Sequence, residues 1–401
     1  MIRRRDPTLV AIAGVIAIGA LIGIAMMLRM DWLLSDELFH RYQIRYFQEG
    51  RWELIPQITT IPGYHLVVSG IGRIVGGPYS DTVSRLATLA GGLWLLPLAS
   101  GIVTQSRPGE GPMRAAQIFF QPILYPFFFL IYTDTWGLVA LAALVLATVR
   151  GRIALAGLAG LAAIAIRQDL IIWVVFALLI LALEGDTWRA RWSIAIRRGW
   201  PLVLVGVVFA GFLAWNHGSV ALGDQKSHER PFNITNLWIF LLYAWAVLLP
   251  YHLWNLERVL LLLRRKAVVA GVALGFVAYW VTYSNLHVYN QESFWLHNAL
   301  LLLMTHEDGL RAILYVPIAW AALSFAATPM PEKRFGALYV FAPLSIVLHP
   351  LIEQRYYLPP LVLFMCWRPA MPPRWEWSTL SVYAATALYL FWNISGGRYF
   401  L

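Results

Sequence analysis

The chain has 401 residues, of which 59% are hydrophobic and only 13% are charged, and its formal net charge is +10. Soluble domains carry about 25% charged residues, so this composition, with long apolar runs from end to end, excludes a soluble globular protein and predicts an all-α polytopic membrane protein. The net charge does not indicate nucleic-acid binding, because the arginines lie in short loops between apolar segments.

The first predicted element is an apolar helix that follows a basic amino terminus. The apolar stretch at 9–28 is longer than the core of a signal peptide, and no small-residue cleavage site follows it. We therefore expect an uncleaved first transmembrane helix, with Arg3–Arg5 on the cytoplasmic side.

Further apolar stretches of helix length predict about 13 spans in all. They cover residues 8–29, 82–103, 114–132, 136–149, 153–166, 170–184, 200–217, 234–253, 267–285, 310–327, 335–348, 357–367 and 377–393. When the sides alternate from a cytoplasmic amino terminus, the basic loops fall on the inner side, as the positive-inside rule requires. These basic positions are 107, 114, 150, 152, 189–198, 258–266, 333–334, 368 and 374.

The remaining loops lie together on the predicted outer side and hold most Asp, Glu, His and amide residues. They are residues 31–81, 133–135, 167–169, 218–232, 286–309 and 349–356. We therefore expect the chemistry on the outer side. No internal repeat is visible in the sequence, which argues against a transporter built from inverted repeats.

The first outer loop, residues 31–81, is predicted to contain two interfacial helices. Ser35 is a candidate N-cap for a helix from Asp36 to about Gln48, with acidic residues in its first turn. A second helix is expected from Pro62 to Val75, about 21 Å long, which is too short to cross the hydrocarbon core. Both helices are expected on the membrane surface or in a re-entrant position.

Asp36 and Glu37 open the first of these helices. The simple interpretation is a pair of solvated interfacial charges, since ionisable groups indicate function mainly inside the membrane. We favour a catalytic role, because the amphipathic helix would hold the pair against the bundle, facing the other polar loops. One carboxylate would then be a general base that removes a proton from an acceptor hydroxyl.

Several motifs in this loop and beyond resemble one known family. They are SDELFH (35–40), FQEGRWELIPQITTIPGYHL (47–66), SRLATL (84–89), PFFFLIYTD (126–134), IRQDLIIWVVF (166–176), GDQKSH (223–228), IEQRYYLPP (352–360) and GRYFL (397–401). In this order they resemble the eukaryotic dolichyl-phosphate-glucose alpha-1,2-glucosyltransferases of the GT-C superfamily, which add the last glucose to the lipid-linked oligosaccharide. The stretch 285–297 matches the family poorly, which leaves the acceptor open.

The resemblance implies one GT-C transmembrane domain over residues 1–401, with residues 31–81 as the catalytic loop. It implies an inverting transfer of a hexose, most simply glucose, from a polyprenyl- or dolichyl-phosphate-sugar to a lipid-linked or envelope glycan. Asp36 or Glu37 would be the base, with Asp36 favoured, and Glu37 would orient the acceptor or hold a neighbouring cation. No D-x-D motif is present, and the single cysteine, Cys366, excludes a cysteine-rich metal site. We expect no metal and no cofactor.

Cations on the outer side are needed to stabilise the leaving phosphate. The candidates are Lys226 and His228 of the GDQKSH motif, Arg355 and Arg167. Simpler interpretations are a hydrated loop for Lys226, a local ion pair with Asp169 for Arg167, and snorkelling for Arg355.

Acceptor and sugar contacts are assigned to His40, Asp134, Asp224, Trp52 and Glu353. For Asp134, the alternative of a cap on the next helix at Thr135 is slightly favoured. Arg85 is expected to pair with Asp81 and close the first loop.

Two further hypotheses stay open from the sequence: a GT-C protein glycosyltransferase and a lipid-linked-sugar transporter. Lysine is nearly absent beside arginine, which indicates a GC-rich bacterial genome and hence an inner-membrane enzyme with a periplasmic site. The alternative location is the endoplasmic reticulum membrane, with a lumenal site.

Overall fold

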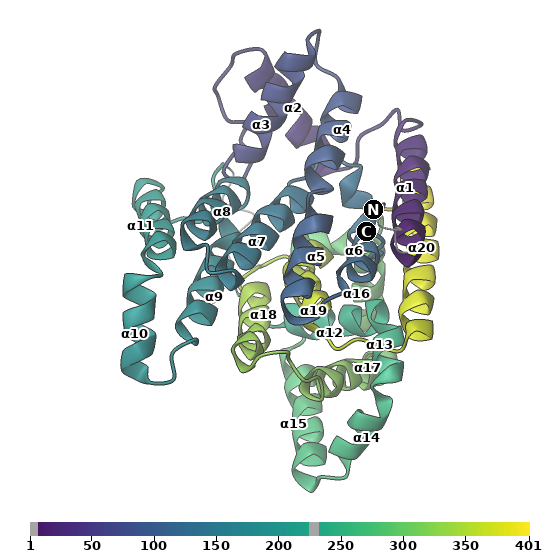
Figure 1. Cartoon of the computed structure of the whole chain (residues 1–401). Coiled ribbons are helices and arrows are strands. Elements are labelled where there is room, and N and C mark those ends of the chain that lie inside the picture. Colours follow the sequence, from purple (N-terminus) through teal and green to yellow (C-terminus); the bar gives the residue numbers. More distant parts are fainter. Residues whose placement is uncertain (1–6, 224–231) are drawn as a thin grey trace.

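The structure, a computed structural model, describes residues 7–223 and 232–401. Within these residues the chain is helical throughout: no β-strand forms, and Trp295 and Phe400 make an isolated bridge. The predicted all-α class is confirmed (Figure 1).

The helices follow the predicted apolar stretches closely. In the first half they are α1 (Pro7–Met27), α2 (Asp36–Gln48), α3 (Gly63–Val75), α4 (Asp81–Gly92), α5 (Leu95–Ser106), α6 (Gly111–Phe119), α7 (Asp134–Val149), α8 (Ile153–Ile166), α9 (Ile171–Ala182), α10 (Trp188–Arg197) and α11 (Trp200–Trp215). In the second half they are α12 (Thr235–Val247), α13 (Leu249–Trp254), α14 (Leu256–Leu263), α15 (Lys266–Thr282), α16 (Leu296–His306), α17 (Asp308–Ala326), α18 (Leu338–Val347), α19 (Leu358–Trp367) and α20 (Pro373–Ser395). Short 3-10 turns are η1 (Tyr125–Phe128), η2 (Gln168–Leu170), η4 (Val288–Gln291), η5 (Lys333–Ala337) and η6 (Gln354–Tyr357).

Several helices are long and apolar enough to cross a membrane. Among the described residues these are α1, the α4–α5 unit (Asp81–Ser106) and α17, and the pair α10 and α11 qualifies together despite a bend of 69°. Shorter apolar helices, among them α7, α8, α12 and α15, accompany them. The chain is therefore a multi-pass membrane protein, while the count of about 13 spans and the GT-C fold remain predictions.

The prediction of one continuous helix over residues 114–132 is wrong. Helix α6 ends at Phe119, and a turn leads into η1 and then into an irregular segment up to α7. Pro122 and Pro126 cannot continue a helix, and the side-chain oxygen of Gln121 accepts a hydrogen bond from the amide of Leu124. The segment is fully buried, which is where non-helical backbone is tolerated in a membrane protein. Similarly, the predicted stretch 234–253 is divided into α12 and α13.

The predicted helices of the first loop are present as α2 and α3, which lie side by side at one end of the molecule (Figure 1). Arg73 of α3 donates to the carbonyl oxygens of Gln48 and Phe47 at the end of α2. Ser35 occupies the N-cap position of α2, but its side chain makes no cap hydrogen bond and its φ is 40°. The capping role predicted for Ser35 is therefore wrong, although the position is right.

The loops predicted to share one side do meet. Gln168, beside η2, donates to the carbonyls of Thr59 (2.7 Å) and Val220 (2.9 Å) and accepts from the amide of Ile61 (2.9 Å). Asn290 exchanges two hydrogen bonds with the backbone of Ile352. These contacts join the predicted outer loops 31–81, 167–169 and 218–232, and attach 286–309 to 349–356.

Two arginines of the predicted inner loops are buried rather than solvated. Arg368 binds Glu376 through both guanidinium nitrogens (3.0 and 2.7 Å) and also contacts Gln117 (2.9 Å), while Arg114 lies 3.4 Å from the same glutamate. This network joins α6 to α20, so these residues have a packing role in addition to any topological one.

Candidate functional site

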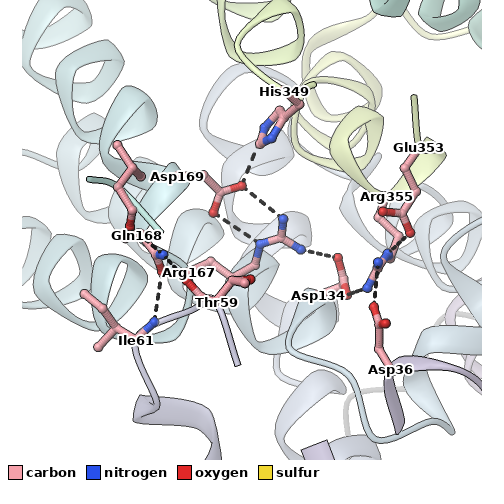
Figure 2. Close-up of polar contacts among 11 residues, drawn as sticks. Asp36, Thr59, Ile61, Asp134, Arg167, Gln168, Asp169, His349, Glu353 and Arg355 are labelled. Atoms are coloured by element: carbon pink, nitrogen blue, oxygen red, sulfur yellow. Dashed lines mark hydrogen bonds and ion pairs between the residues drawn. The ribbon is translucent and has the colours of Figure 1, made fainter. Parts of the chain in front are cut away.

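Asp36, the first residue of α2, forms an ion pair with Arg355 on η6. Oδ2 of Asp36 accepts from Nη2 of Arg355 at 2.8 Å, and 36% of the Asp36 side chain stays exposed (Figure 2). Arg355 also binds Glu353 and lies over the ring of Tyr132, at 5.0 Å from its centroid.

A second guanidinium group, that of Arg167, lies beside the first. It contacts Asp134 at 2.5 Å and Asp169 at 3.0 Å, and the other carboxylate oxygen of Asp134 is 3.9 Å from Arg355. Asp134 therefore lies between the two arginines (Figure 2). Asp134 is the first residue of α7, whose N-cap is Thr133, and its carboxylate binds Arg167, so the cap favoured from the sequence is wrong.

His349 completes this side of the site and was not identified from the sequence. Its Nε2 is 3.8 Å from Asp169, and its ring stacks on Tyr356 at 3.7 Å between centroids. His349 and Tyr356 both lie in the predicted outer loop 349–356, and this location is the one feature of the sequence that could have indicated them. A pocket lined by Asp134, Arg167, His349 and Arg355 opens between these groups.

The ionisation of this cluster differs among its carboxyl groups. Burial raises the pKa of Glu353 above its ordinary value, although Arg355 acts in the opposite direction. Burial also acts to raise the pKa of Asp169, but the charges of Arg167 and His349 and the hydrogen bonds to the carboxylate together outweigh it, and the pKa is lowered. Glu353 is thus the more easily protonated of these two groups.

Glu37 is fully buried and has no free oxygen. Its carboxylate binds Arg85 of α4 through both oxygens (3.1 and 3.0 Å) and accepts from the amides of Ile131 (2.8 Å) and Leu34 (3.0 Å). These contacts correspond to the expected role of holding a neighbouring cation. They also correct the predicted Arg85–Asp81 pair, since Asp81 instead pairs with Arg41 at 3.4 Å.

His40 lies one turn after Asp36 on α2, and its Nδ1 is 2.8 Å from Nε2 of His65 on α3. Burial, helped by the charges of Arg355 and Arg167, lowers the pKa of His40 to about 3. The imidazole is therefore neutral at physiological pH, which suits a hydrogen-bonding role better than proton exchange. His65 was not predicted, although it lies within the FQEGRWELIPQITTIPGYHL motif.

The other predicted site residues are placed as follows. Trp52 is 69% exposed and packs near Phe47 at the far end of α2. Lys226, His228 and Asp224 lie outside the described residues, so their predicted roles remain untested. Of the described neighbours of that segment, Leu222 donates its amide to the carbonyl of Thr59 in the first loop, and Asn233 donates to the carbonyl of Val347, the last residue of α18.

The arginines of the site are suited to binding an anionic group, and the carboxylate of Asp36 is suited to accepting a proton beside it. In the described part of the chain no three His, Cys, Asp or Glu residues are arranged to hold a metal ion. The two guanidinium groups carry donors suited to phosphate oxygens. Asp36 lies beside them with an exposed carboxylate, so a base and anion-binding groups occur together.

Comparison with known proteins gives consistent matches over most of the chain. One similar protein is the Dol-P-Glc:Glc(2)Man(9)GlcNAc(2)-PP-Dol alpha-1,2-glucosyltransferase of Debaryomyces hansenii, 22% identical, with 82% of this chain and 81% of the relative covered. Proteins of the same name from Homo sapiens and Mus musculus are 22% and 24% identical; they cover 89% and 82% of this chain, and 88% and 82% of their own lengths are matched. No solved structure gives a significant match. The profile of the DIE2/ALG10 family matches residues 32–193 and 185–366. As the sequence motifs predicted, the chain belongs to the DIE2/ALG10 family.

Proposed function

We propose that this protein transfers glucose, with inversion, from a polyprenyl- or dolichyl-phosphate-glucose donor to a lipid-linked oligosaccharide on the outer or lumenal face of its membrane. Membership of the DIE2/ALG10 family supports the glucosyltransferase activity, since the relatives carry that name. The observation that carries the assignment of the site is the ion pair between Asp36 and Arg355, which places an exposed carboxylate beside a phosphate-binding group.

In the proposed reaction, Asp36 is the general base. It removes the proton of the acceptor hydroxyl, whose oxygen attacks C1 of the glucose. The bond from C1 to the phosphate oxygen breaks, and its electron pair leaves with the lipid phosphate. Arg355 and Arg167 stabilise the charge that develops on that phosphate.

The donor must compete with carboxylates for the two arginines. In the described part of the site, four carboxyl groups (Asp36, Asp134, Asp169 and Glu353) contact the two guanidinium groups. Binding of an anionic donor is easiest if one of these groups is neutral, and Glu353, whose pKa is raised by burial, is the best candidate. Lys226 and His228 are proposed as further phosphate ligands on the sequence motif alone.

The activity is tested with protein purified in detergent and polyprenyl-phosphate-glucose as the donor. We expect glucose to be transferred to a Glc(2)Man(9)GlcNAc(2) lipid acceptor, the substrate in the names of the relatives, and to be released slowly to water without it. Absence of both transfer and release would contradict the proposal and leave the transporter hypothesis. Transfer to a peptide in place of the glycan would favour the protein glycosyltransferase hypothesis.

A further inference from the structure

A second cleft, of about 690 Å³, is lined by residues around the start of α2 and shares none of them with the pocket at the arginine cluster. It opens between the α1–α2 connection and the start of α4, and its lining includes Trp32, Ser35, Arg41 and Asp81. A volume of this size is within the range of ligand-binding pockets, about 300–1,000 Å³. None of these four residues belongs to the site described above.

The two oxygens of Asp36 are directed to different sides. Oδ2 accepts from Arg355, which lines the first pocket, whereas Oδ1 is 3.5 Å from the hydroxyl of Ser35, which lines the second cleft. Ser35 has a φ of 40°, a conformation that is uncommon outside glycine and is concentrated at functional sites. Asp36 lines neither cavity itself, but its two oxygens contact one lining residue of each, which is the arrangement expected of a base between two substrates.

The charges of the cleft do not suit a phosphate. The charged side chains of its lining are Asp31, Asp81, Arg41 and Arg85. Arg85 is already neutralised by its two contacts with Glu37, which leaves two carboxylates and one guanidinium. An anionic ligand would meet excess negative charge, whereas a neutral polyhydroxylated ligand would not.

The same groups are well suited to sugar hydroxyls. Arg41 and Asp81 lie 3.4 Å apart without forming a hydrogen bond, and 35% and 31% of their side chains are exposed. The guanidinium group can therefore donate hydrogen bonds to sugar hydroxyl groups, and the carboxylate can accept hydrogen bonds from them. Trp32 lines the same cleft, with part of its indole packed near Gly397, and adds a flat apolar surface for a sugar ring.

We infer that this cleft binds the acceptor oligosaccharide, with the hydroxyl that receives glucose directed to Oδ1 of Asp36, while the donor phosphate binds at Arg355 and Arg167. The inference rests on the proposed glucosyltransferase function and adds the location of the second substrate. It assigns Trp32, Arg41 and Asp81 to acceptor binding. Trp52 was the tryptophan of the first loop predicted to bind sugar, and the inference adds Trp32.

The first test compares alanine variants of two arginines on α2, Arg41 and Arg45. Arg41→Ala should raise the KM for the glycan acceptor by about tenfold or more, since a hydrogen bond to a charged group is lost. Arg45→Ala is the control, because Arg45 lies one turn further on α2 and pairs with Glu49 on the surface. Trp32→Ala should act like Arg41→Ala, and Trp32→Phe should retain most of the affinity. A wild-type acceptor KM in both Arg41→Ala and Trp32→Ala would overturn the inference.

The second test measures binding without turnover. Cys366 is buried and is the only cysteine, so a Thr82→Cys variant places a single accessible thiol in the cleft lining. Free Glc(2)Man(9)GlcNAc(2) oligosaccharide should slow its reaction with a maleimide, and this protection should be lost when Arg41→Ala is added. If the oligosaccharide protects the thiol in a protein that does not use the donor, the oligosaccharide site is supported and the proposed glucosyltransferase function is contradicted. Unchanged labelling would overturn the inference even if the donor is used.

Discussion

Oδ2 of Asp36 and Nη2 of Arg355 are 2.8 Å apart although 319 positions separate the two residues in the chain. This contact ties the start of the first-loop helix to the loop before α19. It joins the proposed base to the proposed phosphate ligand, so the state of one substrate site is coupled to that of the other.

Replacement of Arg355 tests the proposed phosphate ligand. Arg355→Ala should raise the KM for polyprenyl-phosphate-glucose by about ten- to hundredfold, since a charge-assisted hydrogen bond is lost. Arg355→Lys should retain part of the affinity, as a point charge without the bidentate geometry. Steady-state kinetics at varied donor concentration give the values. A donor KM in Arg355→Ala equal to that of the native protein would show that Arg355 forms a purely structural ion pair and does not bind the donor phosphate.

Glu37 is expected to act through structure rather than chemistry. Glu37→Gln removes the charge that Arg85 binds in a fully buried position, and breaking one partner of such a pair costs about 3–5 kcal/mol. Thermal unfolding in detergent should show a clear loss of stability. Glu49→Gln, which breaks a surface pair with Arg45, should change stability by less than about 1 kcal/mol. A stable but inactive Glu37→Gln protein would instead restore a direct catalytic role for Glu37.

The dependence of stability on pH should report His40. Its pKa is lowered from 6.5 to about 3 in the folded protein, so in the acid range the unfolded state binds the proton more readily. The stabilising contribution is complete above pH 6.5 and is lost as the pH falls toward 3. His40→Gln should flatten the decrease in melting temperature between pH 6.5 and 4. Identical slopes in the two proteins would show that the imidazole is not held neutral.

Thiol labelling tests the predicted sides of the membrane. Trp52 in the first loop and Trp192 on α10 are both exposed, so cysteines at these positions form a matched pair. In intact cells an impermeant maleimide should label the variant Trp52→Cys and spare Trp192→Cys, which should react only after permeabilisation. The opposite pattern would reverse the orientation and remove the outer-face site.

The local features of the site could be predicted from the sequence. The bounds of α2 and α3 follow to within one residue from the flanking glycines and proline and from the apolar spacing, and the pair Arg167–Asp169 follows from positions two residues apart. Charge counting also grouped loops that contact one another in the structure, because the predicted inner and outer loops differ in arginine content.

The long-range contacts could not be predicted in the same way. Nothing in a single sequence indicates that Arg355 reaches Asp36, or that Glu37 accepts from the amide of Ile131. Hydropathy also treated residues 114–132 as one span, because a buried aromatic turn and a membrane helix are equally apolar. His349 was missed because its importance lies in its contacts with Asp169 and Tyr356, which form only in the folded chain.

The most direct test of the account is the variant Asp36→Asn at the start of α2, compared with Glu49→Gln at the C-cap of the same helix. Asp36→Asn keeps the shape of the side chain and is tolerated near a helix start, but it removes the proposed base. With polyprenyl-phosphate-glucose as donor, turnover should fall by about 10²–10⁴, while donor affinity is largely kept. Glu49→Gln, a surface carboxyl on the same helix, is the control and should behave as the native protein. Normal turnover in Asp36→Asn would show that this carboxylate is not the base and that the catalytic group lies elsewhere.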